Sequence, residues 1–337
     1  MKKFYLFLAA LVAATMLLAA CTPTATPTPV VTAAPTQAPT APPPPPPPEW
    51  GTADKPLVMA LAPSANTETL MAGGEAIAAK LTELTGLVIK TTVPTNYAAL
   101  IEAMGSGNAQ IGWLPPAAYI VAHAKGYSDV GMVTLRNGAD HYAFQFVANA
   151  DAGFTAYYDP DSGNNSVGPA QALGQFAGKK PCWTDPLSAS GYLVPAGYLG
   201  NLGISTKAGA WVQGHPTVIK SVYLSPKGEI CDFGATYVDA RSSIAKDFPD
   251  VNDKVVVVWV SDARIPNDTV AYSSEVPADM RTKLTDALIQ IASTPEGLQL
   301  LKDGGYSIGG LRAVDDAFFD EFRVYLQSIK FDFNNYK

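Results

Sequence analysis

The chain has 337 residues, of which 47% are hydrophobic and 16% are charged, so it carries enough apolar material for a folded core. Its formal net charge at pH 7 is −7, with 30 acidic residues against 23 basic ones. This acidity argues against a nucleic acid or an anionic membrane surface as the binding partner.

The first 20 residues are typical of a secretory signal peptide. Lys2 and Lys3 precede an apolar run at 4–20, which is too short for a stable membrane span. The run leads into LAAC, which looks like a bacterial lipoprotein cleavage site with Cys21 as the lipidated first residue. An ordinary signal peptide with a chance cysteine is the alternative. One lipid group would hold the protein at a membrane without making it span.

Residues 21–49 are rich in Thr, Ala and Pro and contain seven consecutive prolines at 42–48. Such a segment favours the polyproline II conformation and cannot form a packed core. At ~3.1 Å per residue it could hold a folded domain up to about 85 Å from a lipid anchor. We therefore predict a stalk at 21–49, followed by a folded part from Trp50 to Lys337.

The first half of the folded part alternates apolar strands with helical patterns. The helix after the first strand ends at Gly86, and the next helix begins at a cap supplied by Thr95 or Asn96. This alternation is typical of βαβ units and predicts a mostly parallel sheet with helices on its faces. The predicted strands are 57–63, 87–93, 109–114 and 130–135.

A second unit begins at a predicted strand, 141–150. Its unbroken β-branched run at 254–260 predicts a strand that is buried on both faces. The other predicted elements are a loop at 159–168, a helix ending at Ala177, strands at 180–184 and 229–238, and helices at 277–293, 295–303 and 314–328.

The segment TDPLSASGYLVPAGYLG at 184–200 contains a predicted helix start. Ser190 could cap the first turn, and Pro195 fits only near the beginning of a helix. The hydroxyls of Ser188 and Ser190, beside free N–H groups at a positive helix end, would equally form an anion site from neutral donors. The local sequence leaves both interpretations open.

Two cysteines, Cys182 and Cys231, follow Cys21. Outside the cytosol an even pair predicts a disulfide, and two buried thiols are the alternative. Neither a CxxC spacing nor nearby histidines support a zinc site, so we predict no metal and no cofactor.

The common sequence signatures of catalysis are missing from the chain. It contains no GxSxG, GxxxxGK[ST], HExxH or GxGxxG motif. His123 is expected to be structural, and His141 could simply be solvated. A triad of Ser190, His215 and an aspartate is conceivable, but no spacing specifies it. We therefore predict a protein that is not an enzyme, with a phosphoester hydrolase as a remote alternative.

Four segments, in this order, resemble the substrate-binding proteins of phosphonate ABC importers, which bind phosphate, phosphite or phosphonates. The second is the most specific, because the family carries a nearly identical run there. The resemblance covers most of residues 55–330. The segments are NYAALIEAMGSGNAQIGWL, DPLSASGYLVPAGYL, QGHPTV and DARIPNDTVAY.

This resemblance implies an α/β fold of the two-lobed type II periplasmic binding proteins, each lobe a mostly parallel sheet flanked by helices. The chain would cross between the lobes near 138–146 and 260–270. One lobe would contain 50–140 and 265–337, the other 141–264, with the ligand in the cleft between them.

The resemblance also implies a function and partners. The protein would capture a phosphonate such as 2-aminoethylphosphonate, phosphite or phosphate, and deliver it to a permease driven by a cytosolic ATPase. Such a receptor is extracytoplasmic and monomeric, and the membrane would hold it through the lipid anchor only. Alternatives are a binding protein for another small anion on the same fold, such as a sulfonate or nitrate, and a surface or adhesion protein without a small ligand.

The family roles can be transferred where the motifs match. Ala189 stands where the family usually has threonine, so one hydroxyl is missing, and such a hydrogen bond to a charged oxygen is worth ~1.5–3 kcal/mol. For each other position an ordinary structural role is the alternative. The resemblance assigns phosphoryl contacts to Ser188, Ser190, Gly191 and His215, and places Tyr97 and Tyr142 in the cleft.

Asp239 and Asp268 stand where aminophosphonate-binding members of the family place acidic residues. Carboxylates in an anion cleft make sense if they face a cation, such as a ligand ammonium. The alternative is that Asp268 forms a turn and Asp239 caps a helix. The two acids mildly favour an aminoalkylphosphonate over bare phosphate as the ligand.

Overall fold

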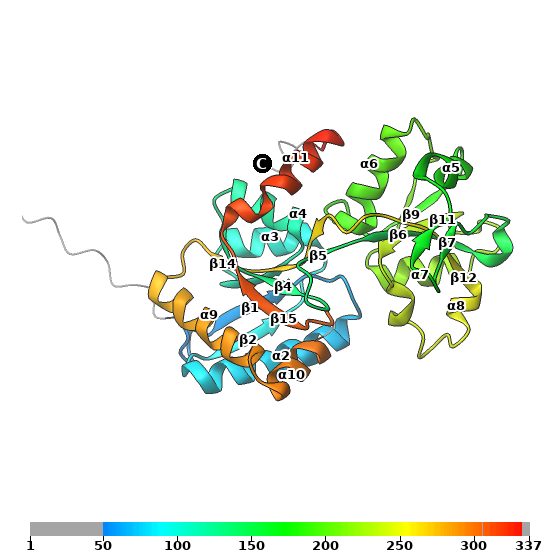
Figure 1. The fold of residues 1–337 in the computed structure, drawn as a ribbon. Helices are drawn as coiled ribbons and strands as arrows, with labels where there is room; N and C mark the ends of the chain where they lie inside the picture. The colour runs from blue at the N-terminus through cyan, green and yellow to red at the C-terminus, as the bar shows by residue number, and fades with distance from the viewer. Residues whose placement is uncertain (1–49, 305, 332–337) are drawn as a thin grey trace, which may run out of the picture. The chain divides into compact units, whose positions relative to one another are not determined.

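The computed structural model describes residues 50–304 and 306–331, which belong to one compact unit (Figure 1). The predicted signal peptide, the lipidated Cys21 and the stalk at 21–49 lie outside the described residues. Among the helices of the described part, none is long and apolar enough to cross a membrane.

One sheet is built from both ends of the described chain. Helices α2 (Thr67–Thr85), α9 (Ala278–Ala292) and α10 (Pro295–Asp303) pack together on one face, and α3 (Tyr97–Gly105) and α4 (Pro116–Ala124) cover the other (Figure 1). Its strands are, in spatial order, β15 (Gly310–Ala313), β4 (Ser128–Leu135), β14 (Thr269–Ser273), β3 (Ile111–Leu114), β1 (Leu57–Leu61) and β2 (Ile89–Thr92).

A second sheet is built from the middle of the chain. A short hairpin of β7 (Tyr158–Asp159) and β8 (Asn164–Asn165) lies beside its edge. The strands are, in spatial order, β10 (Ala210–Trp211), β9 (Pro181–Trp183), β11 (Phe233–Tyr237), β6 (Phe144–Asn149) and β12 (Val255–Val260). The helices of this part are α5 (Pro169–Leu173), α6 (Val194–Asn201), α7 (His215–Tyr223) and α8 (Val251–Lys254).

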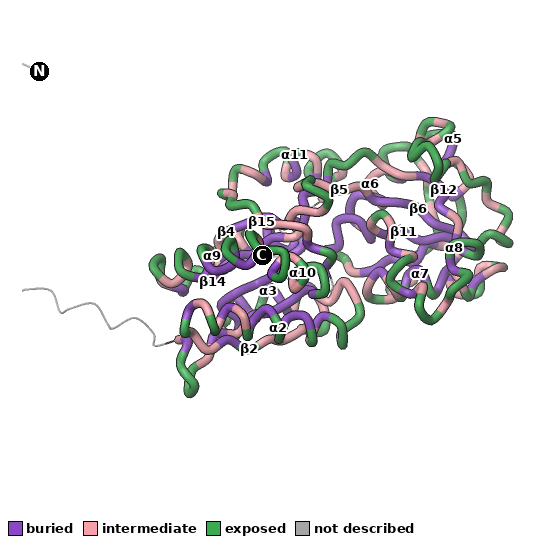
Figure 2. The backbone as a smooth tube through the Cα atoms, turned by 60° about the horizontal axis from the view of Figure 1, so that its bottom comes forward, coloured by how far each residue is buried: buried purple, intermediate pink, exposed green. Residues whose placement is uncertain are grey.

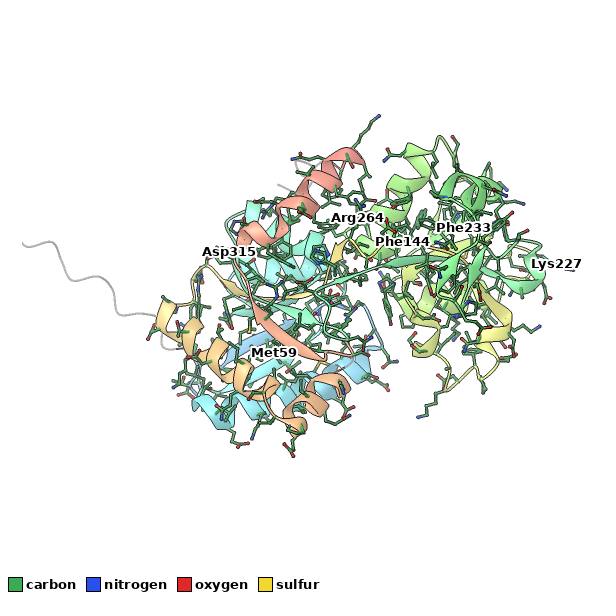
Figure 3. The ribbon with its side chains drawn as sticks, in the orientation of Figure 1. Met59, Phe144, Lys227, Phe233, Arg264 and Asp315 are labelled. Atoms are coloured by element: carbon green, nitrogen blue, oxygen red, sulfur yellow. A yellow bond between two sulfur atoms is a disulfide. The ribbon has the colours of Figure 1, made fainter. Side chains whose placement is uncertain are left out.

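Both sheets carry dense apolar cores. Figure 2 shows that the strands are largely buried while the outer faces of the helices are exposed. Met59 lies in the core of the first sheet, and Phe144 and Phe233 in that of the second (Figure 3). Phe233 stacks on Phe176 with a ring separation of 4.0 Å. This burial is the main stabilising term for each half.

The chain passes between the sheets twice, at 136–143 and at 261–268. The two passages are themselves paired, because β5 (His141–Tyr142) and β13 (Ile265–Pro266) form an antiparallel ribbon in which Ile265 lies opposite Tyr142. A pair of strands joined in this way is a narrow connection between two large bodies.

The predicted α/β architecture is confirmed, but each sheet is mixed and not mostly parallel. Strand β1 runs parallel to β2 and β3, whereas β14 runs antiparallel to β3 and β4. The physical reason is the connection: β14 arrives from the other sheet and not through a helical crossover, so the right-handed βαβ rule does not fix its direction.

The prediction that the run at 254–260 is buried on both faces is wrong. Strand β12 is an edge strand, antiparallel to β6, and Val256 and Val260 are only half-buried. Helix α5 and strand β7 cover part of it. An unbroken β-branched run therefore marks here a partly covered edge strand.

Helix α2 ends and helix α3 begins where the sequence indicates. Asn66 caps α2, and Gly86 ends it with a φ of 72°. Of the two residues proposed to cap α3, Asn96 does so, because its Oδ1 accepts a hydrogen bond from the Ala99 N–H at 2.8 Å. This cap fixes the position of Tyr97 at the first helical residue.

The predicted disulfide between Cys182 and Cys231 is present, and both residues are fully buried. It spans 49 residues of sequence and ties β9 to the segment that precedes β11. Helices α6 and α7 both lie inside the loop that it closes.

The last helix, α11 (Asp320–Ser328), connects with both halves. The 3-10 turn before it packs Phe319 on Tyr119 of α4, with ring centroids 4.7 Å apart. Beyond the helix, Ile329 lies so close to Gly197 of α6 that a Cβ at Gly197 would be 2.5 Å from the Ile329 Cβ. The C-terminal segment therefore contacts the second half as well as the first.

Candidate ligand-binding site

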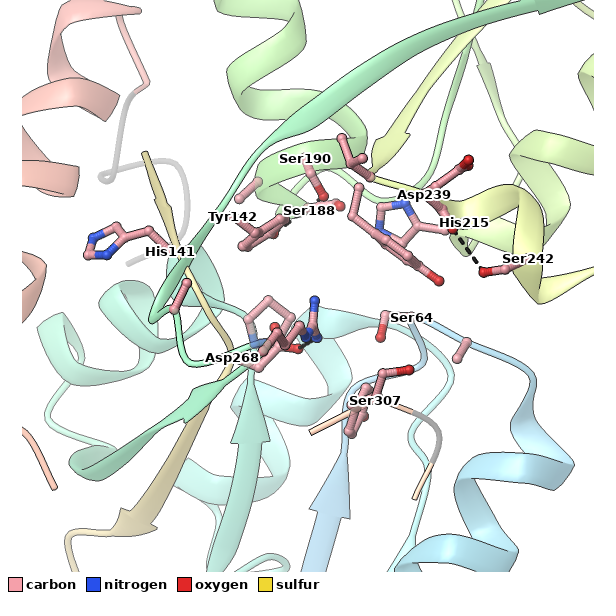
Figure 4. Close-up of a pocket in the computed structure, with 18 of the residues that line it drawn as sticks. Ser64, His141, Tyr142, Ser188, Ser190, His215, Asp239, Ser242, Asp268 and Ser307 are labelled. Atoms are coloured by element: carbon pink, nitrogen blue, oxygen red, sulfur yellow. Dashed lines mark hydrogen bonds and ion pairs between the residues drawn. The ribbon is translucent and has the colours of Figure 1, made fainter. Parts of the chain in front are cut away.

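A cavity of about 450 Å³ lies between the two sheets (Figure 4). Loops that follow β1, β3 and β4 contribute Ser64, Pro115 and Arg136, as expected for a ligand site at the carboxyl ends of strands. The predicted site residues that line it are Tyr97, Tyr142, Ser188, Ala189, Ser190, His215, Asp239 and Asp268.

The serine-rich turn forms one wall of this cavity. Ser188 and Ser190 are buried, and a π-helical turn at Ala189–Leu193 leads into α6. The cap differs from the prediction: Ser188, not Ser190, caps the turn, because its Oγ accepts a hydrogen bond from the Gly191 N–H at 3.1 Å. This bond uses the third N–H of the turn, and Ser190 lines the cavity.

Several donors of the turn are available to a ligand. The Ser190 Oγ accepts a hydrogen bond from the Tyr142 hydroxyl at 3.3 Å, so its own hydrogen is free to donate. For the N–H groups of Ala189 and Ser190, no acceptor is found within residues 50–304 and 306–331. Free first-turn N–H groups beside a serine hydroxyl provide good donors for an oxyanion.

Gly191 lies behind this wall and does not line the cavity. Its N–H, expected to reach the ligand, is used inside the turn by Ser188. A Cβ at this position would lie 2.0 Å from the Thr184 Oγ1, so the turn requires glycine for its close approach to the end of β9. The structure shows a packing contact for Gly191, and a direct contact of this residue with the ligand stays a prediction.

His215 is the first residue of α7 and is almost fully buried. Its ring packs against Tyr237 with centroids 4.7 Å apart, and its Nδ1 has no hydrogen-bond partner in the described structure. Burial, with a smaller effect from Arg136, lowers the pKa of His215 to about 3. The imidazole is therefore neutral at physiological pH and can donate one N–H to an anion.

The buried neutral histidine predicts a pH-dependent stability. The unfolded chain binds a proton at His215 below about pH 6.5, whereas the folded chain does not bind it until the pH approaches 3. The free energy of unfolding should therefore fall as the pH decreases through this window. Urea unfolding at several pH values should show a steeper loss for the wild type than for His215→Gln, by on the order of a few kcal/mol. Parallel curves would contradict this account of His215.

Tyr97 lines the cavity from the start of α3, and Tyr142 lines it from β5, in the ribbon that β5 forms with β13. Burial raises the pKa of both phenols above the usual value, so both stay protonated and can donate hydrogen bonds. The backbone N–H of Tyr97 also donates to the Asp185 carboxylate at 3.3 Å, which joins the start of α3 to the serine-rich segment.

The two predicted acidic residues are present but already have cationic partners. Arg241 binds both carboxylate oxygens of Asp239, through its Nε at 3.0 and 2.9 Å. Arg136 donates to Asp268 at 2.8 Å. Burial alone would raise the pKa of Asp239, but the hydrogen bonds from Arg241 hold this pKa below its usual value. For Asp268 the effect of burial is larger than that of Arg136, so its pKa is raised. The premise that these carboxylates need a ligand cation does not hold.

Arg136 is the principal site residue that the sequence analysis missed. It follows the predicted strand 130–135 directly, so the rule that ligands bind beyond the carboxyl ends of strands could have found it. Its presence also corrects the expectation of a site made from neutral donors alone. The cavity has further lining residues that were not predicted: Ser64, Tyr237, Ser242, Tyr306 and Ser307.

The arrangement does not match a hydrolytic triad. A triad needs a carboxylate that orients the imidazole through its Nδ1, and the Nδ1 of His215 lacks any partner in the part of the chain described. No group of three or more His, Cys, Asp or Glu side chains suited to a metal is found among the described residues.

The chain is similar to known proteins in sequence and in fold. A family model described as "ABC transporter, phosphonate, periplasmic substrate-binding protein" matches residues 59–319. Over 142 residues the chain is 31% identical to the Phosphate-import protein PhnD of Mycolicibacterium smegmatis. This alignment covers 41% of the chain and 40% of the relative, so the chain matches less than half of the length of that relative.

Solved structures share the fold. The binding protein component of an ABC phosphonate transporter from Pseudomonas aeruginosa has a TM-score of 0.68 at 20% identity, covering 81% of this chain and 87% of that chain. PhnD1 from Prochlorococcus marinus, solved in complex with methylphosphonate, has a TM-score of 0.70 at 12% identity, covering 82% and 98%. The predicted two-lobed periplasmic binding protein fold is thereby confirmed.

Proposed function

The chain belongs to the phosphonate family of periplasmic substrate-binding proteins of ABC transporters, and from this premise we propose that it captures phosphate, phosphite or a phosphonate in the cavity between its sheets. The proposal includes delivery of the ligand to a membrane permease coupled to a cytosolic ATPase. It assigns the protein no catalytic step of its own.

The observation that carries the proposal is the serine turn. The Ser190 hydroxyl and the N–H groups of Ala189 and Ser190 lie at one wall of the cavity, and the imidazole of His215, whose Nδ1 has no partner among the described residues, is among the other lining groups. Tetrahedral phosphorus oxyanions present several oxygens that such converging donors can satisfy together.

Capture would proceed by closure of two lobes about the paired strands β5 and β13. We propose lobes of 50–140 with 265–337 and of 141–264, which agrees with the membership of the two sheets. The contact between the Tyr97 N–H and the Asp185 carboxylate joins the two sides of the cavity and would form as they approach.

The family is periplasmic, so the protein acts outside the cytosol. We further propose that Cys21 carries a lipid and that the stalk at 21–49 lets a single receptor reach its permease. Tethering of this kind raises the local concentration of the receptor at the permease without any new contact.

Calorimetric titration of the purified protein with phosphate, phosphite and methylphosphonate tests the proposal. We expect micromolar or tighter binding of at least one of them, since about −8 kcal/mol is accessible to a few charge-assisted hydrogen bonds in a buried site. Sulfate, methylsulfonate and nitrate serve as controls for anion binding in general. Tight binding of a control anion with none of the phosphorus ligands, or no binding at all, would contradict the proposal.

A further inference from the structure

The cavity contains a cation that belongs to the protein. Arg136 lines the cavity, and its guanidinium lies 5.7 Å from the centroid of the Tyr142 ring, in a cation–π arrangement. The same guanidinium donates to Asp268 at 2.8 Å, across 132 residues of sequence. The planar group is thus held between an aromatic face and a carboxylate.

The negative charge of the cavity is already matched. Asp268 is paired with Arg136, and Asp239 is paired with Arg241 by three bonds from one guanidinium. Gln145 gives Asp239 a further hydrogen bond at 3.1 Å. Neither carboxylate is left without a positive partner that a ligand would have to supply.

Arg136 also has spare donor capacity. Its Nε is buried and has no hydrogen-bond partner in the described part of the chain. A guanidinium carries five N–H donors, and within residues 50–304 and 306–331 only one bond, from a terminal nitrogen to Asp268, uses them. The Nε is enclosed by protein, so it is through its remaining terminal N–H groups that Arg136 can attract a ligand oxygen and repel a ligand ammonium.

We propose that Arg136 occupies the place of a ligand ammonium group, so that the cavity selects phosphorus oxyanions without an amine over aminoalkylphosphonates. The inference rests on the proposed function and names its ligand class: phosphate, phosphite and small alkylphosphonates. It reverses the mild preference for an amine-bearing ligand that the two acidic residues suggested.

The selectivity follows from what an ammonium would have to displace. Arg136 already donates to the Oδ2 of Asp268, so an ammonium that approaches this carboxylate must compete with a charge-assisted hydrogen bond for it. It would also enter a partly buried space beside a fixed positive charge, where repulsion is poorly screened. An alkyl chain of the same length meets neither obstacle.

The test compares 2-aminoethylphosphonate with propylphosphonate, its near-isostere, by calorimetric titration of the purified protein. For the wild type we expect propylphosphonate to bind at least about tenfold tighter. Arg136→Met frees Asp268 and should shift the ratio of the two affinities toward the amine by about tenfold or more. In the double variant Arg136→Met/Asp268→Asn this gain should disappear.

Two further variants keep the test decisive. Arg136→Lys retains a cation and should keep the wild-type discrimination even if Arg136→Met does not fold. Arg264→Met removes an equal charge from an exposed arginine outside the cavity and should leave the ratio unchanged.

The outcomes separate this inference from the function on which it rests. If none of the phosphorus ligands binds the wild type, the proposed function fails. If they bind but the wild type takes the amine as tightly as its isostere, or if Arg136→Met leaves the ratio unchanged, the role of Arg136 alone is overturned.

Discussion

Alanine in place of Gly191 should weaken ligand binding by about 100-fold or more, the scale of loss caused by moving binding groups by about 1 Å. The added Cβ would lie 2.0 Å from the Oγ1, 2.6 Å from the Cγ2 and 2.8 Å from the Cβ of Thr184. Thr184 is buried, and its short branched side chain cannot turn away. The turn must therefore shift, and it would carry Ser190 and the free N–H groups with it.

A second glycine in the same segment provides the control. Gly200 lies in α6, and an added Cβ there meets no atom within 4 Å. Gly200→Ala should bind like the wild type, while overpacking at Gly191 should lower the free energy of unfolding by roughly 1–3 kcal/mol. Wild-type affinity in Gly191→Ala would show that the turn does not hold the ligand.

Removal of the disulfide should lower the free energy of unfolding by about 4 kcal/mol, which is the chain-entropy value for a loop of this length. The Cys182→Ala/Cys231→Ala variant releases a loop of 49 residues that contains both the serine turn and His215. The unfolded chain gains freedom, so the folded state becomes relatively less stable. Chemical unfolding of the variant and the wild type measures the difference.

Dithiothreitol provides the control for this experiment. It should destabilise the wild type once the bridge becomes accessible during unfolding, and it should leave the double-alanine variant unchanged. A loss of under about 1 kcal/mol would mean that the two buried cysteines stabilise the fold by packing and not by the covalent link.

The fold was largely predictable because its first half repeats one local pattern. Apolar strands followed by helices with clear caps, such as Asn96 before α3, identify βαβ units without any long-range information. The direction of β14 was not predictable in this way, because it depends on a connection between two sheets. The burial of β12 was not predictable for a related reason. An edge strand and a central strand can have the same kind of sequence and differ only in their neighbouring strands.

The site was predictable where a short motif encodes it. The serines of the DPLSASG segment and His215 of QGHPTV all line the cavity, as the resemblance of these motifs to the phosphonate family implied. The pair of Arg136 and Asp268 was beyond reach, because the two residues are 132 positions apart and neither carries a local signal for the other. The charge balance inside a cavity depends on which residues are neighbours in space. Asp239 and Asp268 alone therefore suggested a ligand with an amine, whereas their arginine partners argue against it.

The contact of Ile329 with Gly197 bears on how the cavity can open. This contact joins the halves in addition to the two backbone passages and the bond between Tyr97 and Asp185, and the space beside Gly197 is filled by Ile329. A rotation that widens the cavity must either keep Ile329 in place as a pivot or pull it away and expose apolar surface to water. In the second case the contact of Ile329 with Gly197 stabilises the closed conformation relative to the open one. The residue at position 329 then affects how readily the cavity opens and releases its ligand.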